Sequence, residues 1–200
     1  VGYMQDYVRK FLEDVEGFNF QFVVQNEQLG TGHALLQAND SIKNSRFIVM
    51  YGDDLYHHED IKKIINNDLC VTAQEVKDPE RFGVFTIKNG IMEDLIEKPK
   101  NSVSNLANTG LYILNKDIFN FLEKSEKSQR NEIELTDAIL KMSKEFPVKC
   151  EITQSWVPIG YPWDLLIANE IRMKKSETMI NSTASIDKNV TIENSVKIGK

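Results

Sequence analysis

Short β-rich apolar runs alternate with longer helical patterns over most of this chain. The runs FNFQFVV (18–24) and GLYILN (110–115) are typical of strands, and RFIVMYGDD (46–54) is typical of a buried strand. Such alternation with helical patterns predicts an α/β fold, in which helices pack on a sheet. The predicted helices span 8–12, 33–40, 57–67, 117–124, 134–146 and 163–175, and the predicted strands span 18–24, 46–54, 69–76, 82–87, 91–97, 110–115 and 148–153. Lys88-Asn89-Gly90 favours a hairpin between 82–87 and 91–97.

After residue 175 the pattern changes to a period of six. Ile186, Ile192 and Ile198 recur at this interval, and a small aliphatic residue stands two positions before each of them. Neither a helix nor a plain strand has this period, whereas each face of a parallel β-helix does. We therefore predict a first domain over 1–175 and the start of a β-helix over 176–200. So short a stack cannot bury its own core, and we expect it to continue or to pack on neighbours.

The composition excludes several classes of protein. Hydrophobic residues make up 41% of the chain and charged residues 27%, as in an ordinary globular domain. A net charge of −6 argues against nucleic acid as a partner. No apolar run approaches the roughly 20 residues needed to span a bilayer, so we expect no membrane partner. Cys70 and Cys150 lie in separate β-like runs and are expected to be buried free thiols in a reducing compartment.

The loop QNEQLGTGHA (25–34) lies between an apolar run and a helical one. A glutamine such as Gln25 offers both a donor and an acceptor, enough to contact the edge of a pyrimidine, and the glycines allow a close backbone approach to a flat ligand. The residues Gly30-Thr31-Gly32 are equally consistent with a helix-entry turn in which Thr31 is a cap.

Two further groups of polar residues end predicted strands. Asp53 follows the run RFIVMY, and a carboxylate at the carboxyl end of a strand can hold Mg²⁺ against phosphate; it could also simply cap the strand. Glu97-Lys98 follows another strand, where the carboxylate could accept sugar hydroxyls while the ammonium counters a phosphate charge. Asn108 could do either job, and a surface ion pair is the alternative for Glu97-Lys98.

The chain resembles the sugar-1-phosphate nucleotidylyltransferases along nearly its whole length. The motifs that carry the resemblance occur in the family's order and spacing: QNEQLGTGHALLQA, FIVMYGDD, DPERFGVF, LIEKP, LANTGLYIL, EIELTDAI and IGYPWDLLIANE. Within the family the chain is similar to N-acetylglucosamine-1-phosphate uridyltransferases and glucose-1-phosphate thymidylyltransferases, and more closely to archaeal enzymes with a C-terminal left-handed β-helix. The resemblance implies a Rossmann-like, GT-A-like mixed sheet with flanking helices, followed by the start of that left-handed β-helix.

The resemblance also implies roles for single residues. Gln25 would contact the uracil or thymine ring, with Gly30 and Thr31 beside the base, and Asp53 would hold Mg²⁺. Lys98 would lie beside the sugar phosphate. The implied sugar contacts are Gly83, Glu97, Asn108, Glu134 and Thr136. The implied reaction transfers a nucleotidyl group from UTP or dTTP to N-acetylglucosamine 1-phosphate or glucose 1-phosphate and releases pyrophosphate.

Two departures from the family pattern qualify this expectation. Where the family has a second metal carboxylate this chain has Pro158, which cannot ligate a cation, and the nearest substitute is Asp164. Asp164 would also favour the N-terminus of the helix in which it stands. The Gly-rich loop that clamps the triphosphate, with about 50 to 80 residues around it, does not occur in the chain. We therefore expect residues 1–200 alone to be inactive.

Three functions follow as hypotheses. The first is a cytoplasmic nucleotidylyltransferase that forms a homodimer or homotrimer. The second is a non-catalytic sugar-nucleotide sensor or regulatory subunit, which Pro158 and the missing clamp favour. The third is one part of a bifunctional protein whose β-helix is an acyltransferase.

Overall fold

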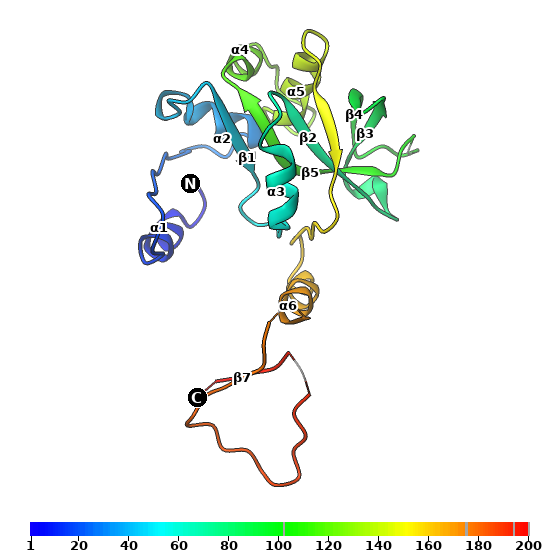
Figure 1. Ribbon diagram of the computed structural model, residues 1–200. Coiled ribbons are helices and arrows are strands. Elements are labelled where there is room, and N and C mark those ends of the chain that lie inside the picture. The colour runs from blue at the N-terminus through cyan, green and yellow to red at the C-terminus, as the bar shows by residue number, and fades with distance from the viewer. Residues whose placement is uncertain (102, 175, 194, 200) are drawn as a thin grey trace. The chain divides into compact units, whose positions relative to one another are not determined.

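The structure is a computed structural model that describes residues 1–200 except Ser102, Lys175, Asn194 and Lys200 (Figure 1). It divides into two compact units. The first consists of Val1–Tyr51 and His58–Gln154, and the second of Gly52–His57 and Ser155–Lys200. This division falls earlier than the predicted domain end, Lys175, which lies outside the described residues. The assignment of 1–175 and 176–200 as functional domains stays a prediction.

The first unit is built on a mixed six-stranded sheet with the order β1-β5-β2-β6-β4-β3. Its strands are β1 (Arg46–Met50), β2 (Cys70–Glu75), β3 (Gly83–Lys88), β4 (Ile91–Glu97), β5 (Leu106–Asn115) and β6 (Lys149–Ile152). Only β2 and β6 pair in parallel among these, and the other pairs are antiparallel. The predicted α/β class is confirmed.

The predicted hairpin forms at Lys88-Asn89-Gly90. Asn89 has φ 52° and Gly90 has φ 76°, the two positive values that a type I′ turn requires. The register shifts by one residue between Thr86 and Ile87, and beyond this shift Gly83 on β3 lies opposite Glu97 on β4. The hairpin and its irregularity thus bring together two residues of the predicted sugar site.

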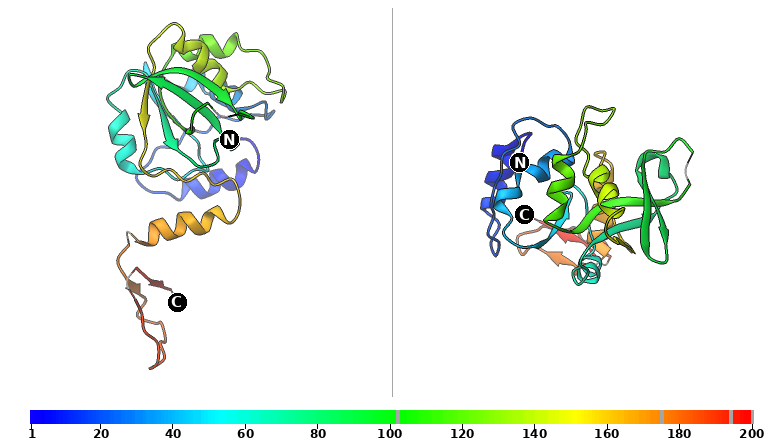
Figure 2. Two further views of the ribbon diagram at one scale, coloured as in Figure 1. Left: turned by 90° about the vertical axis from the view of Figure 1, so that its right-hand side faces the viewer. Right: turned by 90° about the horizontal axis from the view of Figure 1, so that it is seen from above.

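Helices cover both faces of this sheet. They are α2 (Thr31–Gln37), α3 (His58–Ile64), α4 (Asp117–Glu123) and α5 (Leu135–Ser143), whereas α1 (Gln5–Glu13) buries no residue; short 3₁₀ turns span Asn39–Ser41 and Pro79–Arg81. Helices α2, α4 and α5 lie together on one face, and α3 lies on the other (Figures 1 and 2). Apolar side chains of α4 and α5, such as Leu122 and Ile139, form one buried cluster with the strand residues Val71 and Tyr112. This core holds the ends of β4 and β5 and the start of α5, which carry predicted site residues.

Two predicted strands differ from the structure. The run 46–54 is not buried, because β1 pairs with β5 alone and its residues alternate between exposed and half-buried. The run 18–24 is not a strand: its Val23 carbonyl accepts from the N-terminal ammonium of Val1, and no strand among the described residues pairs with it. Its phenylalanines pack against one another instead: Phe18 lies 5.7 Å from Phe20 between ring centroids, and Phe20 lies 6.2 Å from Phe22.

Both cysteines are buried free thiols, as predicted. Burial raises the pKa of each thiol to about 12, so both stay protonated at neutral pH. In the parallel pair of β2 and β6, Val71 rather than Cys70 lies opposite Cys150. The two thiols therefore point to opposite faces of the sheet and cannot form a disulfide without rearrangement.

The second unit contains α6 (Asp164–Lys174) and two short strands, β7 (Met179–Ile180) and β8 (Lys197–Ile198). The strands pair in parallel, with Ile180 opposite Ile198, so the chain returns to the same line after three six-residue repeats. A coil of three hexads would return in this way. No helix in the described part of either unit is long and apolar enough to cross a membrane.

Candidate functional site

The Gln25 loop is held by hydrogen bonds between side chains and backbone. The Gln25 amide nitrogen donates to the Gly30 carbonyl at 3.1 Å and lies 3.0 Å from Nδ1 of His33. The other ring nitrogen, His33 Nε2, lies 3.2 Å from the amide nitrogen of Gln37. Both N–H groups of Gln25 are thus engaged, and its oxygen is the group left to contact a ligand.

The loop packs against the segment that leads into α5. Gly30 has φ 102°, and a Cβ there would lie 2.7 Å from the Ile133 carbonyl, so the position requires glycine. The Thr31 hydroxyl accepts a hydrogen bond from the backbone N–H of Leu135 at 3.2 Å. Leu135 is the first residue of α5, so Thr31 satisfies one of that helix's unpaired N–H groups. Thr31 is therefore a cap for α5, and not for its own helix α2, whose N-cap is Gly30.

A second group of predicted residues meets at the ends of β3, β4 and β5. A Cβ at Gly83 would lie 2.8 Å from Glu97 Oε2 and 3.8 Å from the Asn108 Cβ, so only glycine leaves the carboxylate its place. Lys98 follows Glu97 with φ 43°, and its N–H donates to the Phe82 carbonyl at 3.0 Å. This contact fixes the backbone at the point where the Glu97 and Lys98 side chains leave the sheet.

Asn108 has a fixed amide orientation. Its oxygen accepts from the Gly110 N–H at 3.1 Å, and its nitrogen lies 2.7 Å from the hydroxyl of Tyr112. Tyr112 is fully buried, and its hydroxyl lies 3.5 Å from that of Tyr51. The core of the unit therefore determines which way Asn108 presents its donor and acceptor.

Arg130 joins two carboxylates of the predicted sugar site, Glu97 and Glu134, although sequence reasoning did not select it. Its Nη2 lies 2.9 Å from Glu134 Oε1 and 3.6 Å from Glu97 Oε1. The same Glu134 oxygen accepts from the Ser128 hydroxyl at 3.0 Å. Glu134 is 6% exposed, and Thr136, the second residue of α5, is also buried. The signal that could have identified Arg130 is its position four residues before Glu134 in SQRNEIELTD.

The clustered carboxylates change one another's acidity. Burial raises the pKa of Glu97 above its ordinary value, and Arg130 and Lys98 oppose this rise. Burial, and then the charge of Glu134, raise the pKa of Asp137 on α5. Burial alone would lower the pKa of the Arg130 guanidinium, but Glu134 and Glu97 hold it above its ordinary value. Arg130 is thus a permanent cation near two acids, Glu97 and Asp137, whose pKa values are raised.

The predicted residues of the first unit therefore lie in one connected line. Direct neighbours lead from Gln25 and Gly30 through Thr31 and α5 to Glu134, and through Arg130 to Glu97, Gly83 and Asn108. Such a line offers hydrogen-bonding groups at one end, where a base could lie, and carboxylate, amide and guanidinium groups at the other.

The predicted metal residue Asp53 belongs to the second unit. Asp53 is exposed, whereas its neighbour Asp54 is half-buried. Asp54 accepts from the Trp156 indole N–H at 2.9 Å and from the Ile159 N–H at 3.2 Å. Burial raises the pKa of Asp54, and these two hydrogen bonds oppose the rise. Asp54 thus anchors the 156–159 segment, and Asp53 is the carboxylate that can take a ligand.

Asp164 is the first residue of α6, and it is engaged by the backbone. Its Oδ2 accepts from the N–H of Gly160 at 3.0 Å and from that of Tyr161 at 2.8 Å. These contacts favour the capping alternative over metal ligation. Within the described residues no group of three or more His, Cys, Asp or Glu is arranged to hold a metal ion.

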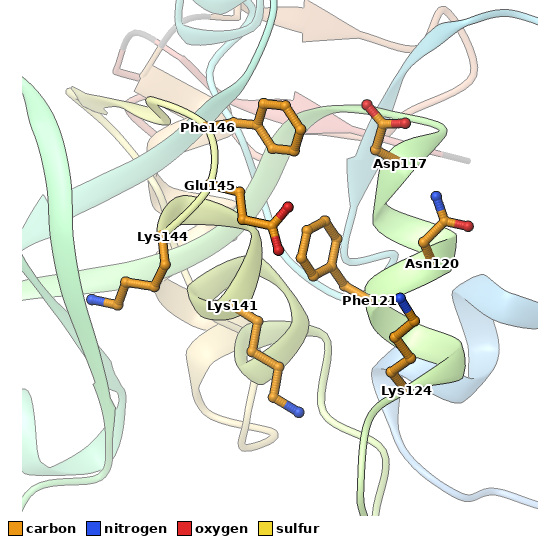
Figure 3. A pocket seen from close by; sticks show the side chains of 8 residues that line it. All are labelled: Asp117, Asn120, Phe121, Lys124, Lys141, Lys144, Glu145 and Phe146. Carbon is orange, nitrogen blue, oxygen red and sulfur yellow. The ribbon is translucent and has the colours of Figure 1, made fainter.

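A cavity of about 530 Å³ lies between α4 and α5, outside this line of residues (Figure 3). Phe121 from α4 faces Phe146 beyond α5, with the Glu145 carboxylate beside them. Lys144 points away and donates to the Glu93 carbonyl at 2.8 Å. None of the predicted site residues lines this cavity.

Comparisons with known proteins agree with the resemblance. The family described as "Nucleotidyl transferase" matches residues 3–175. The chain is 42% identical to the bifunctional protein GlmU of Methanococcus aeolicus, over 89% of this chain and 43% of that protein. It is 33% identical to a bifunctional sugar-1-phosphate nucleotidylyltransferase/acetyltransferase of Sulfurisphaera tokodaii, over 97% of this chain and 47% of that one.

A solved structure shares the fold. The crystal structure of a UDP-glucose pyrophosphorylase complexed with UDP-glucose superimposes with a TM-score of 0.71 at 26% identity, over 88% of this chain and 74% of that one. The chain spans less than half the length of the two curated relatives named above. The family match covers most of the residues that form the sheet, the connected line and α6, and the chain belongs to the nucleotidyl transferase family.

Proposed function

We propose that this chain supplies the base and sugar contacts of an enzyme that transfers a nucleotidyl group from UTP or dTTP to a sugar 1-phosphate. N-acetylglucosamine 1-phosphate and glucose 1-phosphate are the proposed acceptors. The observation that carries the proposal is the connected line from Gln25 to Asn108, which includes the Glu97, Arg130 and Glu134 cluster. The names of the relatives, which refer to sugar-1-phosphate and UDP-glucose chemistry, support it.

The sugar end of the line suits a phosphorylated sugar. Carboxylates accept hydrogen bonds from hydroxyl groups, and the oriented Asn108 amide adds a donor and an acceptor. Arg130 pairs with Glu97 and Glu134, and a phosphate could compete for its guanidinium in the bidentate geometry that arginine favours. Lys98 would add a second positive charge next to Glu97. We propose Glu97, Asn108, Glu134, Thr136 and Gly83 as the sugar contacts.

The proposed reaction needs no protein nucleophile. An oxygen of the sugar 1-phosphate attacks the α-phosphorus of the triphosphate, the bond from that phosphorus to the β-phosphate oxygen breaks, and pyrophosphate leaves. The protein's contribution is to position the reactants and to neutralise charge. Lys98 and Arg130 would stabilise the negative charge that the phosphates share.

Asp53 fits a divalent cation better than Asp164 does. Mg²⁺ in nucleotide sites is usually held by one or two carboxylates together with substrate phosphates, so an exposed carboxylate without a protein cage suits it. Both backbone contacts of Asp164 occupy one carboxylate oxygen, which weakens it as a second ligand. A bound Mg²⁺ would supply charge neutralisation at the phosphates. We propose Asp53 as the residue that holds it.

The C-terminal residues support a second activity. The parallel pairing of β7 with β8 after three hexads is what a first β-helix coil would give. A relative's name includes an acetyltransferase, and we propose that 176–200 begin a left-handed β-helix of that kind. A homodimer or homotrimer in the cytoplasm stays a prediction of the sequence.

The test is pyrophosphate release by the complete gene product with Mg²⁺, assayed over UTP, dTTP and CTP and over the two sugar phosphates. The proposal expects turnover with a uracil or thymine nucleotide and one of these sugars. Saturable binding of nucleotide sugars without pyrophosphate release from any pair would overturn it in favour of a regulatory subunit. In the Gln25→Ala variant the KM for the triphosphate should rise far more than the KM for the sugar phosphate.

A further inference from the structure

The amide of Gln25 has an orientation that its surroundings determine. Its nitrogen donates to the Gly30 carbonyl, a group that can only accept, so the nitrogen and oxygen cannot exchange places without loss of this hydrogen bond. The second N–H of the same nitrogen points to Nδ1 of His33 at 3.0 Å. Nδ1 must therefore be the unprotonated nitrogen of the ring.

This requirement fixes the tautomer of His33. A neutral imidazole carries its proton on one nitrogen, so an accepting Nδ1 places the proton on Nε2. Nε2 lies 3.2 Å from the amide group of Gln37, whose oxygen can accept that proton when the amide is turned by half a rotation. Gln25 then donates both to the Gly30 carbonyl and to His33, and His33 donates in turn to the Gln37 oxygen.

We propose that His33 is a positioning residue that, together with the Gly30 carbonyl, makes Gln25 present its oxygen to the base, and that it thereby helps to select a pyrimidine with an N3–H group over cytosine. Uracil and thymine carry an N3–H group, which can donate a hydrogen bond to the Gln25 oxygen. Cytosine carries a lone pair at N3, which would face the lone pairs of that oxygen. A buried or shielded polar group left opposite a like group is costly, so one fixed amide can discriminate.

The inference rests on the proposed function in one respect, the contact between Gln25 and the base. The orientation itself is independent of any substrate. A ¹⁵N-detected NMR spectrum of the side chain of His33 in the complete gene product should show an unprotonated Nδ1 and a protonated Nε2. A proton on Nδ1 in the folded protein at neutral pH would overturn the proposal.

The kinetic arm compares kcat/KM for UTP with that for CTP. His33→Leu should reduce the UTP preference about fivefold, the factor expected for one neutral hydrogen bond, mainly through a higher KM for UTP. His33→Asn should restore part of the preference, because an asparagine oxygen can accept from the Gln25 amide. His58→Leu makes the same chemical change at the start of α3, on a side chain that is 69% exposed, and should leave the preference unchanged.

The outcomes separate the two claims. If the wild-type protein turns over UTP and its preference over CTP is the same in His33→Leu, the role of His33 is wrong and the proposed function stands. If the wild type releases pyrophosphate from no triphosphate, the proposed function fails and base selection fails with it. Circular dichroism of each variant identifies a loss of fold. If His33→Leu does not fold, the UTP preference of His33→Asn and the NMR spectrum of the wild type decide whether His33 has the proposed role.

Discussion

The two units hold their polar residues in different ways. In the first unit the side chains of the connected line are fixed by the core: Tyr112 is fully buried beneath Asn108, and Glu134 is 6% exposed. In the second unit Asp54 anchors Trp156 and Ile159, while Asp53 beside it is exposed. The comparison indicates that the fold can preorganise the proposed base and sugar contacts, whereas the proposed metal carboxylate would need substrate phosphates to complete its site.

The largest expected effect is a loss of kcat on substitution of Asp53, which would distinguish this residue from its neighbour Asp54. Asp53→Asn should lower kcat about 100-fold, because it removes about 3 kcal/mol of charge stabilisation that depends on the metal. Its midpoint of urea unfolding should stay that of the wild type, since the side chain is exposed. Steady-state kinetics and urea titration check both parts. A kcat within threefold of the wild type would remove Asp53 from the proposed metal site.

Asp54→Ala, unlike Asp53→Asn, should lower the stability of the fold. It removes the carboxylate that accepts from the N–H groups of Trp156, which is 5% exposed, and of Ile159, at a cost of about 2 kcal/mol in the free energy of unfolding. Asp53→Ala is the matched control and should change this free energy by less than about 0.5 kcal/mol. Equal losses in the two variants would contradict the assignment of Asp54 as an anchor.

Tyr112→Phe tests whether the core orients Asn108. The variant keeps the ring in the core and removes the hydroxyl 2.7 Å from the Asn108 amide nitrogen. We expect the KM for the sugar phosphate to rise about fivefold, the equivalent of about 1 kcal/mol, while the KM for UTP is unchanged. Tyr51→Phe removes a more distant hydroxyl, 3.5 Å from that of Tyr112, and should have the smaller effect. An increase in both KM values would indicate general loosening instead.

The smallest expected effect is the pH dependence of sugar binding. The folded-state pKa of Glu97 lies above its ordinary value of 4.5. As the pH falls through this raised pKa, the carboxylate becomes protonated and the KM for the sugar phosphate should rise at a higher pH than an ordinary glutamate would cause. Glu97→Gln should abolish this limb of the profile. A limb that persists in Glu97→Gln would assign the titration to another group.

The raised pKa of Glu97 also determines the direction in which stability changes with pH. With a raised pKa the folded state binds more protons than the unfolded state between pH 4.5 and the folded value, so ionisation of Glu97 lowers stability as the pH rises through this window. Glu97→Gln should therefore be at least as stable as the wild type at neutral pH. Urea unfolding at pH 7 checks this, and a clear destabilisation would show that the ion pair with Arg130 outweighs the cost of burial.

Local patterns predicted much of the fold, because they depend on neighbours in sequence. The Asn89-Gly90 turn needs only two adjacent residues with positive φ, and the predicted hairpin formed around it. Pairing partners are not local, so the run 46–54 was predicted to be buried although β1 pairs on one side. The strand predicted at 18–24 was wrong for the same reason.

The site shows the same limit of sequence reasoning. Glu97 and Asn108 could be selected because each follows or ends an apolar run, and the structure brings both beside Gly83. Arg130 lies in a polar loop, and the sequence of that loop does not indicate its contact with Glu97 on β4. Thr31 was considered a cap for its own helix, but its hydroxyl accepts from Leu135, more than one hundred positions along the chain. Distances in sequence of this size are bridged only by the fold.

The central claim is that one connected line of residues holds the base at the Gln25 end and the sugar at the Asn108 end. Titration of ¹⁵N-labelled protein with UDP-N-acetylglucosamine, followed by NMR amide shifts, tests it most directly. The account predicts saturable shifts with one dissociation constant at Gly30, Glu97 and Asn108, and none at the Lys124 and Lys141 positions of the α4–α5 cavity. Shifts confined to that cavity, or to one end of the line, would contradict it.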